Sequence, residues 1–465
     1  MQRAGAAAFW VGGMNPAARG VRTGRLLIML GLIGVTLIGL DIIAASLHIP
    51  GQLGIGSNGL LRDFVTLMAA EGILYGMAVW LVCRVALPRR SLWMIIGLAL
   101  AMRAVVLATP PFLSTDIHRY VWDGMVQDAG INPYRYKPDA PQLAFLRTPA
   151  IYPGINRKHT ARTIYPPVAE AIFALVARIN PSILAMRLAM TGFDLVAMLA
   201  LLALLRIARR PLSWILIYAW HPLLIWEIAG NGHVDAIVVA FVAMALLAAA
   251  RRQSGWAAVA LSGAVLAKFL PLAMMPSLWR PRVWRFPVIL LGLTVIVYAP
   301  YADIGMHVLG FLPGYVHQEG LANGIGIFWL LPLERLMALP PMIGVLYLGF
   351  AALGLLWLGF RVWLSPLPVD QAERARLLAV DAGFLATALT LVMTPHYPWY
   401  FIWLVVPLCV TPTISGIYLT VSAFLLYLDP VHSKLIWPAL VFLPTLILGS
   451  WLRLRNPLTK QIEAP

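Results

Sequence analysis

The chain has 465 residues, of which 61% are hydrophobic and 12% are charged, and its formal net charge is +16. Soluble domains carry about twice that share of charged residues, so the composition excludes a soluble globular protein. The cations lie in short clusters between long apolar runs, which excludes nucleic-acid binding as the reason for the positive charge. We therefore expect an all-α polytopic membrane protein that forms a single integral membrane domain over residues 1–465.

The arginine clusters set the predicted topology, because the cytoplasmic loops of membrane proteins are enriched in Arg and Lys. With every cluster on the cytoplasmic side, the apolar runs predict about fourteen transmembrane helices with both termini inside. The predicted helices cover residues 25–47, 64–87, 92–111, 182–205, 212–228, 234–250, 255–268, 270–280, 286–303, 340–362, 376–394, 397–411, 414–428 and 433–452. We divide the segment around Lys268 into two short helices, because a single span would place three arginines on the outer side.

Two stretches, residues 112–181 and 303–339, do not fit this pattern, and we predict both as extracytoplasmic loops with interfacial helices. The apolar piece "PPVAEAIFALVARI" of the first loop would reach only about 20 Å as a helix, which is too short for a hydrocarbon core of about 30 Å. We expect this first loop to be catalytic. The second loop contains His317 and Glu319, which we place over the site on position alone.

The stretch "STDIHRYVWDGMVQDAGINPY" opens the first loop and predicts a helix that starts near Asp116, with the preceding serine or threonine as its N-cap. Five polar residues would share one face of this helix, because they are three or four positions apart. They are Asp116, Arg119, Tyr120, Asp123 and Gln127. Gly130 suits a C-terminal cap, and the chain then continues through Asn132 and Tyr134.

Other polar residues fall on the same outer side in this topology, within "GNGHVD", "LAKFLPL" and "TPHYPWY". They are Asn231, His233, Asp235, Lys268, His396, Trp399 and Tyr400. The cytoplasmic connections carry mainly arginine. We therefore expect the chemistry on the extracytoplasmic face.

These motifs, together with "TIYPPVAEAIF", resemble GT-C-fold glycosyltransferases. The similarity is to bacterial polyprenyl-phosphate-mannose-dependent mannosyltransferases, and to the mannosyltransferase that adds the first mannose in GPI-anchor assembly. The resemblance implies a GT-C-like fold in a bacterial inner membrane, with the active site on the periplasmic side. One position departs from the GPI enzyme, whose Asp-x-Asp motif reads Asp116-x-His118 in this chain.

The resemblance implies an inverting transfer of a hexose, expected to be mannose, from a polyprenyl-phosphate donor to a lipid or glycan hydroxyl. Such a reaction needs a base for the hydroxyl proton and cations for the departing phosphate. We assign the base to Asp116, because enzymes of this fold use an acidic residue in this loop, and the first cation to Lys268, which lies inside an apolar run. The predicted substrate-binding residues are Arg119, Tyr120, Asp123, Asn132, Tyr134, Tyr165, Asn231, His233, Asp235, Lys268, His396, Trp399 and Tyr400.

Structural roles remain open for most of these residues. The Asp116 carboxylate could serve only to stabilise the N-terminus of its helix electrostatically. The Lys268 side chain could extend along the apolar core to place its ammonium group at the membrane interface, and the aromatic residues could belong to an interfacial belt. Four further arginines are secondary phosphate ligands or partners of Asp123, Asp194 or Glu170. They are Arg103, Arg119, Arg135 and Arg187.

No cofactor is predicted beyond the lipid-linked sugar, which is a substrate. The histidines are scattered over separate loops without a metal-ligand spacing, and both cysteines lie in apolar runs, so no metal site is indicated. The expected partners are the donor, the acceptor and membrane lipids, with no nucleic acid. The alternatives are transfer of another lipid-linked sugar, a lipid or sugar transporter, and a noncatalytic assembly subunit.

Overall fold

The computed structural model describes residues 16–47, 58–85, 87–280, 283–312, 314, 326–337, 339–429 and 435–455. Every regular element in these residues is a helix, which confirms the all-α prediction. His317 and Glu319, which we placed over the site from the sequence, lie outside the described residues.

Seven helical stretches within the described residues are long and apolar enough to cross a membrane. They are α1 (Pro16–Ser46), α2 (Asn58–Arg84), α3 (Arg90–Leu107), α6 (Ile183–Ile207), α12 (Arg285–Tyr298) continued by η6 (Ala299–Leu309), α15 (Pro341–Leu364) and α16 (Gln371–Met393). An eighth candidate is a pair of segments bent by 55°, residues 212–219 and 222–230. These apolar helices are compatible with a membrane protein.

The remaining helices, apart from the 20-residue α19 (Ile436–Arg455), are shorter than a bilayer crossing usually requires. They are α4 (Asp116–Asp128), η1 (Pro141–Leu146), η2 (Tyr152–Gly154), α5 (Pro167–Ile179), η3 (Leu212–Ile215), α7 (Leu216–Ala219), α8 (Pro222–Leu224), η4 (Ile225–Gly230), α9 (Asp235–Ala250), α10 (Ser254–Val265), η5 (Leu270–Met274), α11 (Met275–Leu278), α14 (Leu331–Glu334), η7 (Pro398–Leu404), α17 (Val405–Val410), α18 (Ile414–Ser422), η8 (Ala423–Leu428) and α19 (Ile436–Arg455). Each of the fourteen predicted spans overlaps at least one helix, but the number of membrane crossings stays a prediction. The expected break near Lys268 is present, because α10 ends before this residue and η5 begins after it.

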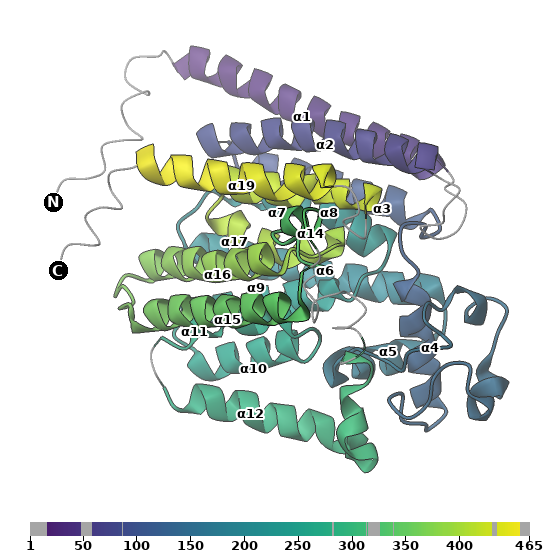
Figure 1. Ribbon diagram of the computed structural model, residues 1–465. Coiled ribbons are helices and arrows are strands. Elements are labelled where there is room, and N and C mark those ends of the chain that lie inside the picture. The colour runs from purple at the N-terminus through teal and green to yellow at the C-terminus, as the bar shows by residue number, and fades with distance from the viewer. Residues whose placement is uncertain are drawn as a thin grey trace.

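The long helices run side by side, and α4 and α5 lie beyond one end of them (Figure 1). The arginine-bearing connections meet at the opposite end. There Arg209 forms an ion pair of 3.4 Å with Asp370, and Arg376 Nε donates to the Ala208 carbonyl at 2.9 Å. Arg374 Nε donates to the carbonyl of Ala250 at 3.3 Å, at the C-terminus of α9.

The helix α9 connects the two ends of the protein. Asp235 begins it and Ala250 ends it, and its length of 16 residues corresponds to about 24 Å. The polar loops at the Asp235 end of α9 are therefore separated from the arginine-bearing connections by most of the thickness of a hydrocarbon core. The segregation of polar and cationic loops that the sequence predicted is present in the structure.

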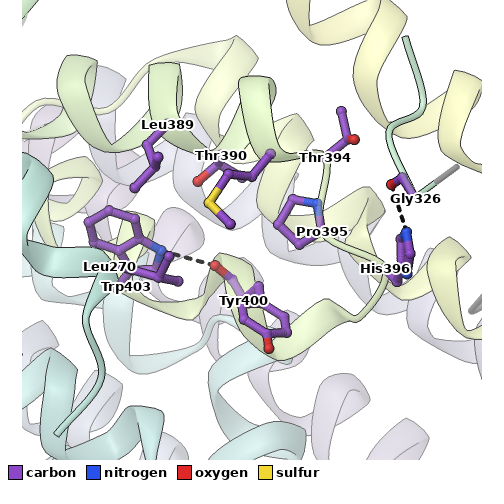
Figure 2. Close-up of a pocket in the computed structure, with 10 residues that line it drawn as sticks. Leu270, Gly326, Leu389, Thr390, Thr394, Pro395, His396, Tyr400 and Trp403 are labelled. Atoms are coloured by element: carbon purple, nitrogen blue, oxygen red, sulfur yellow. Dashed lines mark hydrogen bonds between the residues drawn. The ribbon is translucent and has the colours of Figure 1, made fainter. Parts of the chain in front are cut away.

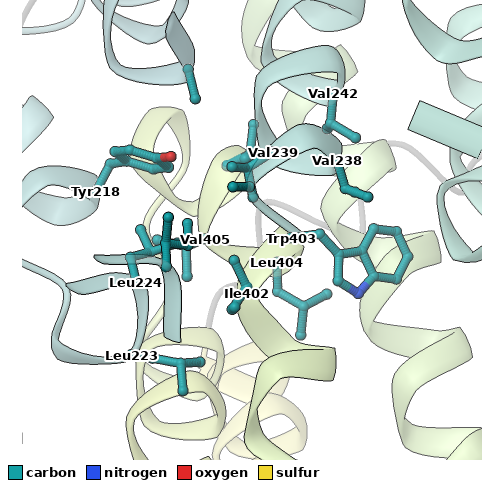
Figure 3. Packing of buried hydrophobic residues seen from close by; sticks show 14 of the residues in the cluster. Tyr218, Leu223, Leu224, Val238, Val239, Val242, Ile402, Trp403, Leu404 and Val405 are labelled. Carbon is teal, nitrogen blue, oxygen red and sulfur yellow. The ribbon is translucent and has the colours of Figure 1, made fainter. Parts of the chain in front are cut away.

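The core beside α9 fixes the position of η7. Val238, Val239 and Val242 of α9 pack with side chains of η7 and α17, among them Ile402 and Val405 (Figure 3). All of these side chains are at most 2% exposed. Because η7 carries the aromatic residues of "HYPWY", this apolar contact holds them next to the N-terminus of α9.

The polar face of α4 packs against α5. Arg119 Nε lies 2.9 Å from both carboxylate oxygens of Asp123, and both side chains are buried. Gln127 donates to the Glu170 carboxyl at 2.8 Å, and the Thr163 hydroxyl donates to its other oxygen at 2.6 Å. Burial raises the pKa of Glu170 well above its usual range, and the nearby Asp123 carboxylate raises it further. These polar residues therefore join α4 to α5.

Gly124 permits the close approach of these two helices. A Cβ atom at this position would collide with the backbone carbonyl of Phe173 on α5. We expect Gly124→Ala to reduce the free energy of unfolding by about 1–3 kcal/mol through overpacking. Thermal unfolding in detergent measures this effect. Gly192→Ala on α6 is the matched control, because that position has open space around it, and an equal loss in both variants would contradict the packing role.

Candidate active site

A cavity of about 530 Å³ lies where the segment before α5 meets the loops that follow α3, η4, α10 and α16. Its polar lining residues come from segments far apart in the sequence: Ser114, Thr115, Asp116, Asn156, Arg157, His233, Asp235 and Lys268. Its apolar lining residues include Ile164, Phe269, Leu270, Leu312 and Met393. Tyrosine and tryptophan side chains complete the wall: Tyr120, Tyr165, Tyr397, Trp399 and Tyr400. The cavity is therefore amphipathic.

Asp116 is the first residue of α4 and presents a partly exposed carboxylate to this cavity. Thr115 occupies the N-cap position, but its side chain makes no capping hydrogen bond. The backbone N–H of Asp116 donates to the Ser114 hydroxyl at 3.2 Å. Asn156 Nδ2 donates to Asp116 Oδ1 at 2.5 Å. The side chain keeps 20% of its surface exposed, and Oδ2 lies 4.0 Å from His233 Nδ1. One carboxylate oxygen is thus anchored, and the other faces the cavity and the imidazole.

His233 is buried behind Asp116. Its Nε2 lies 3.3 Å from Oε2 of Glu227, and the side chains of the two residues are 1% and 0% exposed. Asn231 donates to the same Glu227 oxygen at 3.1 Å and accepts from the backbone N–H of Leu113 at 3.3 Å. Asn231 therefore ties η4 to the segment before Asp116 and does not line the cavity.

Lys268 and Asp235 form an ion pair in the cavity wall. Lys268 Nζ lies 2.9 Å from both carboxylate oxygens of Asp235, and it sits 4.0 Å from the centre of the Tyr400 ring. The Asp235 side chain is 1% exposed and the Lys268 side chain 17%. The ammonium group reaches the cavity with its charge largely neutralised, and Arg157 is a second cation in the lining.

The aromatic residues of η7 form a stack at the cavity wall. The Trp399 ring lies between His233, at 4.4 Å between centroids, and Tyr397, at 4.5 Å. His396 lies in a neighbouring cavity of about 40 Å³, where its Nε2 is 2.8 Å from the carbonyl oxygen of Gly326 (Figure 2). The two cavities share Leu270, Met393 and Tyr400 in their linings.

The structure brings eight of the predicted site residues into the main cavity. They are Asp116, Tyr120, Tyr165, Asp235, Lys268, Trp399 and Tyr400, with His233 lining the same wall. Arg119 and Asp123 are instead buried between α4 and α5. Asn132 donates to Asp303 at 2.6 Å in a separate surface depression, and the Tyr134 hydroxyl donates to the Tyr165 carbonyl at 2.6 Å.

The secondary arginines make structural contacts. Arg103 forms an ion pair of 2.6 Å with Asp194 inside the helical core. The sequence leaves this pairing open as an alternative to phosphate binding. Arg135 pairs with Asp303, and Arg187 donates to backbone carbonyls, including that of Ala229 at 3.0 Å.

Sequence reasoning missed four residues that shape the site. Asn156 and Arg157 lie in the middle of the first loop, and Tyr397 precedes Trp399. Glu227 carried a usable signal, because it is a carboxylate inside the apolar run "LLIWEIAG" and such charges usually mark functional sites in membrane proteins. Within the described residues, no group of three or more His, Cys, Asp or Glu side chains is arranged to hold a metal ion.

Residues 17–280 match the family model of the alpha-(1->6)-mannopyranosyltransferase N-terminal domain, which covers more than half of the chain. The chain belongs to this family. No curated protein and no solved structure matches it. The resemblance to mannosyltransferases is thereby confirmed, and the protein is a mannose-transferring glycosyltransferase by family. The match includes Asp116, His233 and Lys268, whereas Trp399 and Tyr400 come from the part of the chain beyond it.

Removing one partner of the Lys268–Asp235 pair leaves a buried charge without compensation. We expect Lys268→Met to reduce the free energy of unfolding by about 3–5 kcal/mol. Asp235→Asn added to Lys268→Met removes the stranded charge, so the double variant should recover most of this loss. Thermal unfolding in detergent compares the three proteins. Equal destabilisation of the single and double variants would show that the pair has no coupling.

Proposed function

We propose that this mannosyltransferase moves mannose from a polyprenyl-phosphate donor to a hydroxyl of a lipid or glycan acceptor. The observation that supports the proposal is the amphipathic cavity, which combines a partly exposed carboxylate, two cations and an apolar wall. A nucleotide-linked sugar would need no apolar wall, and a transporter would need polar groups reachable from both ends. The family match favours transfer chemistry over transport.

The donor fits the cavity by its two chemically distinct parts. Phe269 and Leu270 line the cavity, and Phe269 remains 37% exposed on the outer surface. A polyprenyl chain would lie along this apolar side. The phosphate would lie near Arg157 and Lys268, because guanidinium and ammonium groups donate charge-assisted hydrogen bonds to phosphate oxygens. We propose that these cations, without a divalent metal, stabilise the charge of the departing phosphate.

Asp116 is proposed to act as the general base. The acceptor oxygen attacks C1 of mannose while its proton moves to the Asp116 carboxylate, and the C1–O bond to phosphate breaks with its electron pair on the phosphate. Asp235 is a poorer base, because both of its oxygens are held by Lys268 and its side chain is only 1% exposed. A retaining mechanism would need a second carboxylate as nucleophile, so we propose transfer with inversion at C1.

The acceptor position and the membrane side are part of the same proposal. The linkage in the family's name suggests the 6-hydroxyl of a mannose unit as acceptor. The cavity and the arginine-bearing connections lie at opposite ends of the helices, which supports a periplasmic site by the preference of arginine for the cytoplasm. The GT-C fold and the bacterial inner membrane remain proposals drawn from the sequence resemblance.

Replacing the proposed base tests the reaction. Asp116→Asn keeps the shape of the side chain but cannot accept the proton, so transfer should fall by at least about 100-fold. The assay measures labelled product from polyprenyl-phosphate-[labelled] mannose and a membrane lipid extract. Asp128→Asn, at the exposed far end of the same helix, is the control and should keep wild-type activity. Full activity of Asp116→Asn would exclude this residue as the base.

Cysteine labelling tests the membrane side. In a chain whose native cysteines are replaced by alanine, Asp128→Cys lies near the cavity end and Gln253→Cys lies between α9 and α10. Both positions are exposed. A membrane-impermeant maleimide added to spheroplasts should label the cysteine at 128 and spare the one at 253 until the membrane is opened. The reverse pattern would place the cavity in the cytoplasm.

A further inference from the structure

We propose that Glu227 and His233 form a buried proton relay that positions Asp116 and receives the proton that it removes from the acceptor. This inference rests on the proposed function, because it assumes that Asp116 is the base. The family match assigns no role to Glu227 or His233, and the sequence predicted His233 as a substrate-binding residue. The relay follows from the order of three side chains: Glu227, His233 and Asp116.

The imidazole lies between two carboxylates. Its Nε2 is 3.3 Å from Glu227, and its Nδ1 is 4.0 Å from Asp116. Glu227 and His233 are fully enclosed, whereas Asp116 keeps 20% of its side chain exposed to the cavity. Only one end of this row therefore reaches the substrate, and the other end is sealed from solvent.

The sealed end is fixed by two hydrogen bonds to Glu227, whereas His233 Nε2 makes only a close approach of 3.3 Å without hydrogen-bond geometry. The Tyr427 hydroxyl donates to Glu227 Oε1 at 2.7 Å, and Asn231 donates to Oε2 at 3.1 Å. Glu227 lies within η4, a π-helical turn, and Asn231 follows its last residue. Such turns are frequent at functional sites. Gly232 follows with φ of +73°, and a Cβ there would collide with Ile117 of α4. The backbone thus holds His233 against Asp116.

The distances fit a neutral imidazole in the resting enzyme. With its proton on Nε2, facing Glu227, the ring presents a lone pair at Nδ1 to the Asp116 carboxylate. Two acceptors repel each other, which agrees with the separation of 4.0 Å. When Asp116 takes the acceptor proton, its new O–H can donate to Nδ1, and the gap can close.

The proton balance of the step is complete. The acceptor O–H bond breaks, its oxygen bonds to C1, and the phosphate leaves with the electron pair of the C1–O bond. The proton moves to Asp116 and then to Nδ1, which gives an imidazolium between Glu227 and Asp116. After the products leave, the proton returns through Asp116 to solvent and the resting state is restored.

Other charged groups near His233 make hydrogen bonds or ion pairs with other partners. Arg187 approaches through the Gly232 turn, and its guanidinium donates to the carbonyl of Ala229. Asp235 is held by Lys268. From η7 the imidazole meets the Trp399 ring, and from η8 Tyr427 reaches it only through Glu227. The two carboxylates of the relay are therefore the groups that control its protonation.

The test is the pH dependence of kcat in His233→Gln and Glu227→Gln, measured with the labelled donor. In the wild type, the acid limb should reflect protonation of the His233–Asp116 pair as a unit. His233→Gln should lower kcat by on the order of 100-fold and move the acid limb to lower pH, because the imidazole that receives the proton is gone. Glu227→Gln removes the charge that favours the imidazolium, so it should move the limb to lower pH by a smaller amount. The KM for the donor should change little in both.

Tyr427→Phe is the matched control, because it should move the acid limb in the opposite direction to Glu227→Gln. It removes a donor from Glu227 and leaves more negative charge to stabilise the imidazolium, so its acid limb should move to higher pH. Thermal unfolding in detergent identifies any variant that fails to fold. If His233→Gln fails to fold, the pH profile of Glu227→Gln decides the test, because this substitution preserves the shape of the side chain. A lower kcat with an unchanged acid limb in His233→Gln or Glu227→Gln would reduce His233 to a structural role and overturn the relay. If Asp116→Asn is active, the proposed base itself fails, which separates the two results.

Discussion

The arrangement of the helices depends on the free-energy cost of placing charged side chains inside an apolar helical assembly. A buried charge without a partner costs several kcal/mol in a medium of low polarity, so pairing with an opposite charge is favoured. Arg103 meets Asp194, Arg119 meets Asp123, and Lys268 meets Asp235. The first pair joins α3 to α6, the second lies within α4, and the third joins the start of α9 to the break after α10. Asp116 differs from these carboxylates, because it is partly exposed and one of its oxygens accepts from the amide of Asn156.

The same constraint assembles the site. The pair between Lys268 and Asp235 joins the break after α10 to the start of α9. The apolar packing of α9 against η7 then brings Trp399 onto the His233 ring. The residues of α4 are held from the other side by α5, through buried polar contacts and the space left by Gly124. Four separate segments thus converge on one cavity without any of them forming it alone.

The sequence and the structure agree best where a strong local signal exists. A carboxylate at a helix start, a lysine in an apolar run and a proline-led helix too short to span all lie where local chemistry indicated. Residues with weak local signals were assigned less well. Asn132 and Tyr134 belong to the same motif as Asp116, but a helix of 13 residues separates them from it. Proximity in sequence did not mean proximity in space.

The sequence by itself predicted the all-helical fold, the long apolar helices, the arginine-bearing connections and the place of Asp116 at the start of a helix. These features depend on composition, hydrophobic run length and capping chemistry, which act over a few turns of chain. Only the tertiary structure decided which charges neutralise each other and which face the cavity. The contacts of Asn156 with Asp116, and of Glu227 with His233, depend on packing between segments, because no local pattern specifies which distant side chain will meet a buried ion.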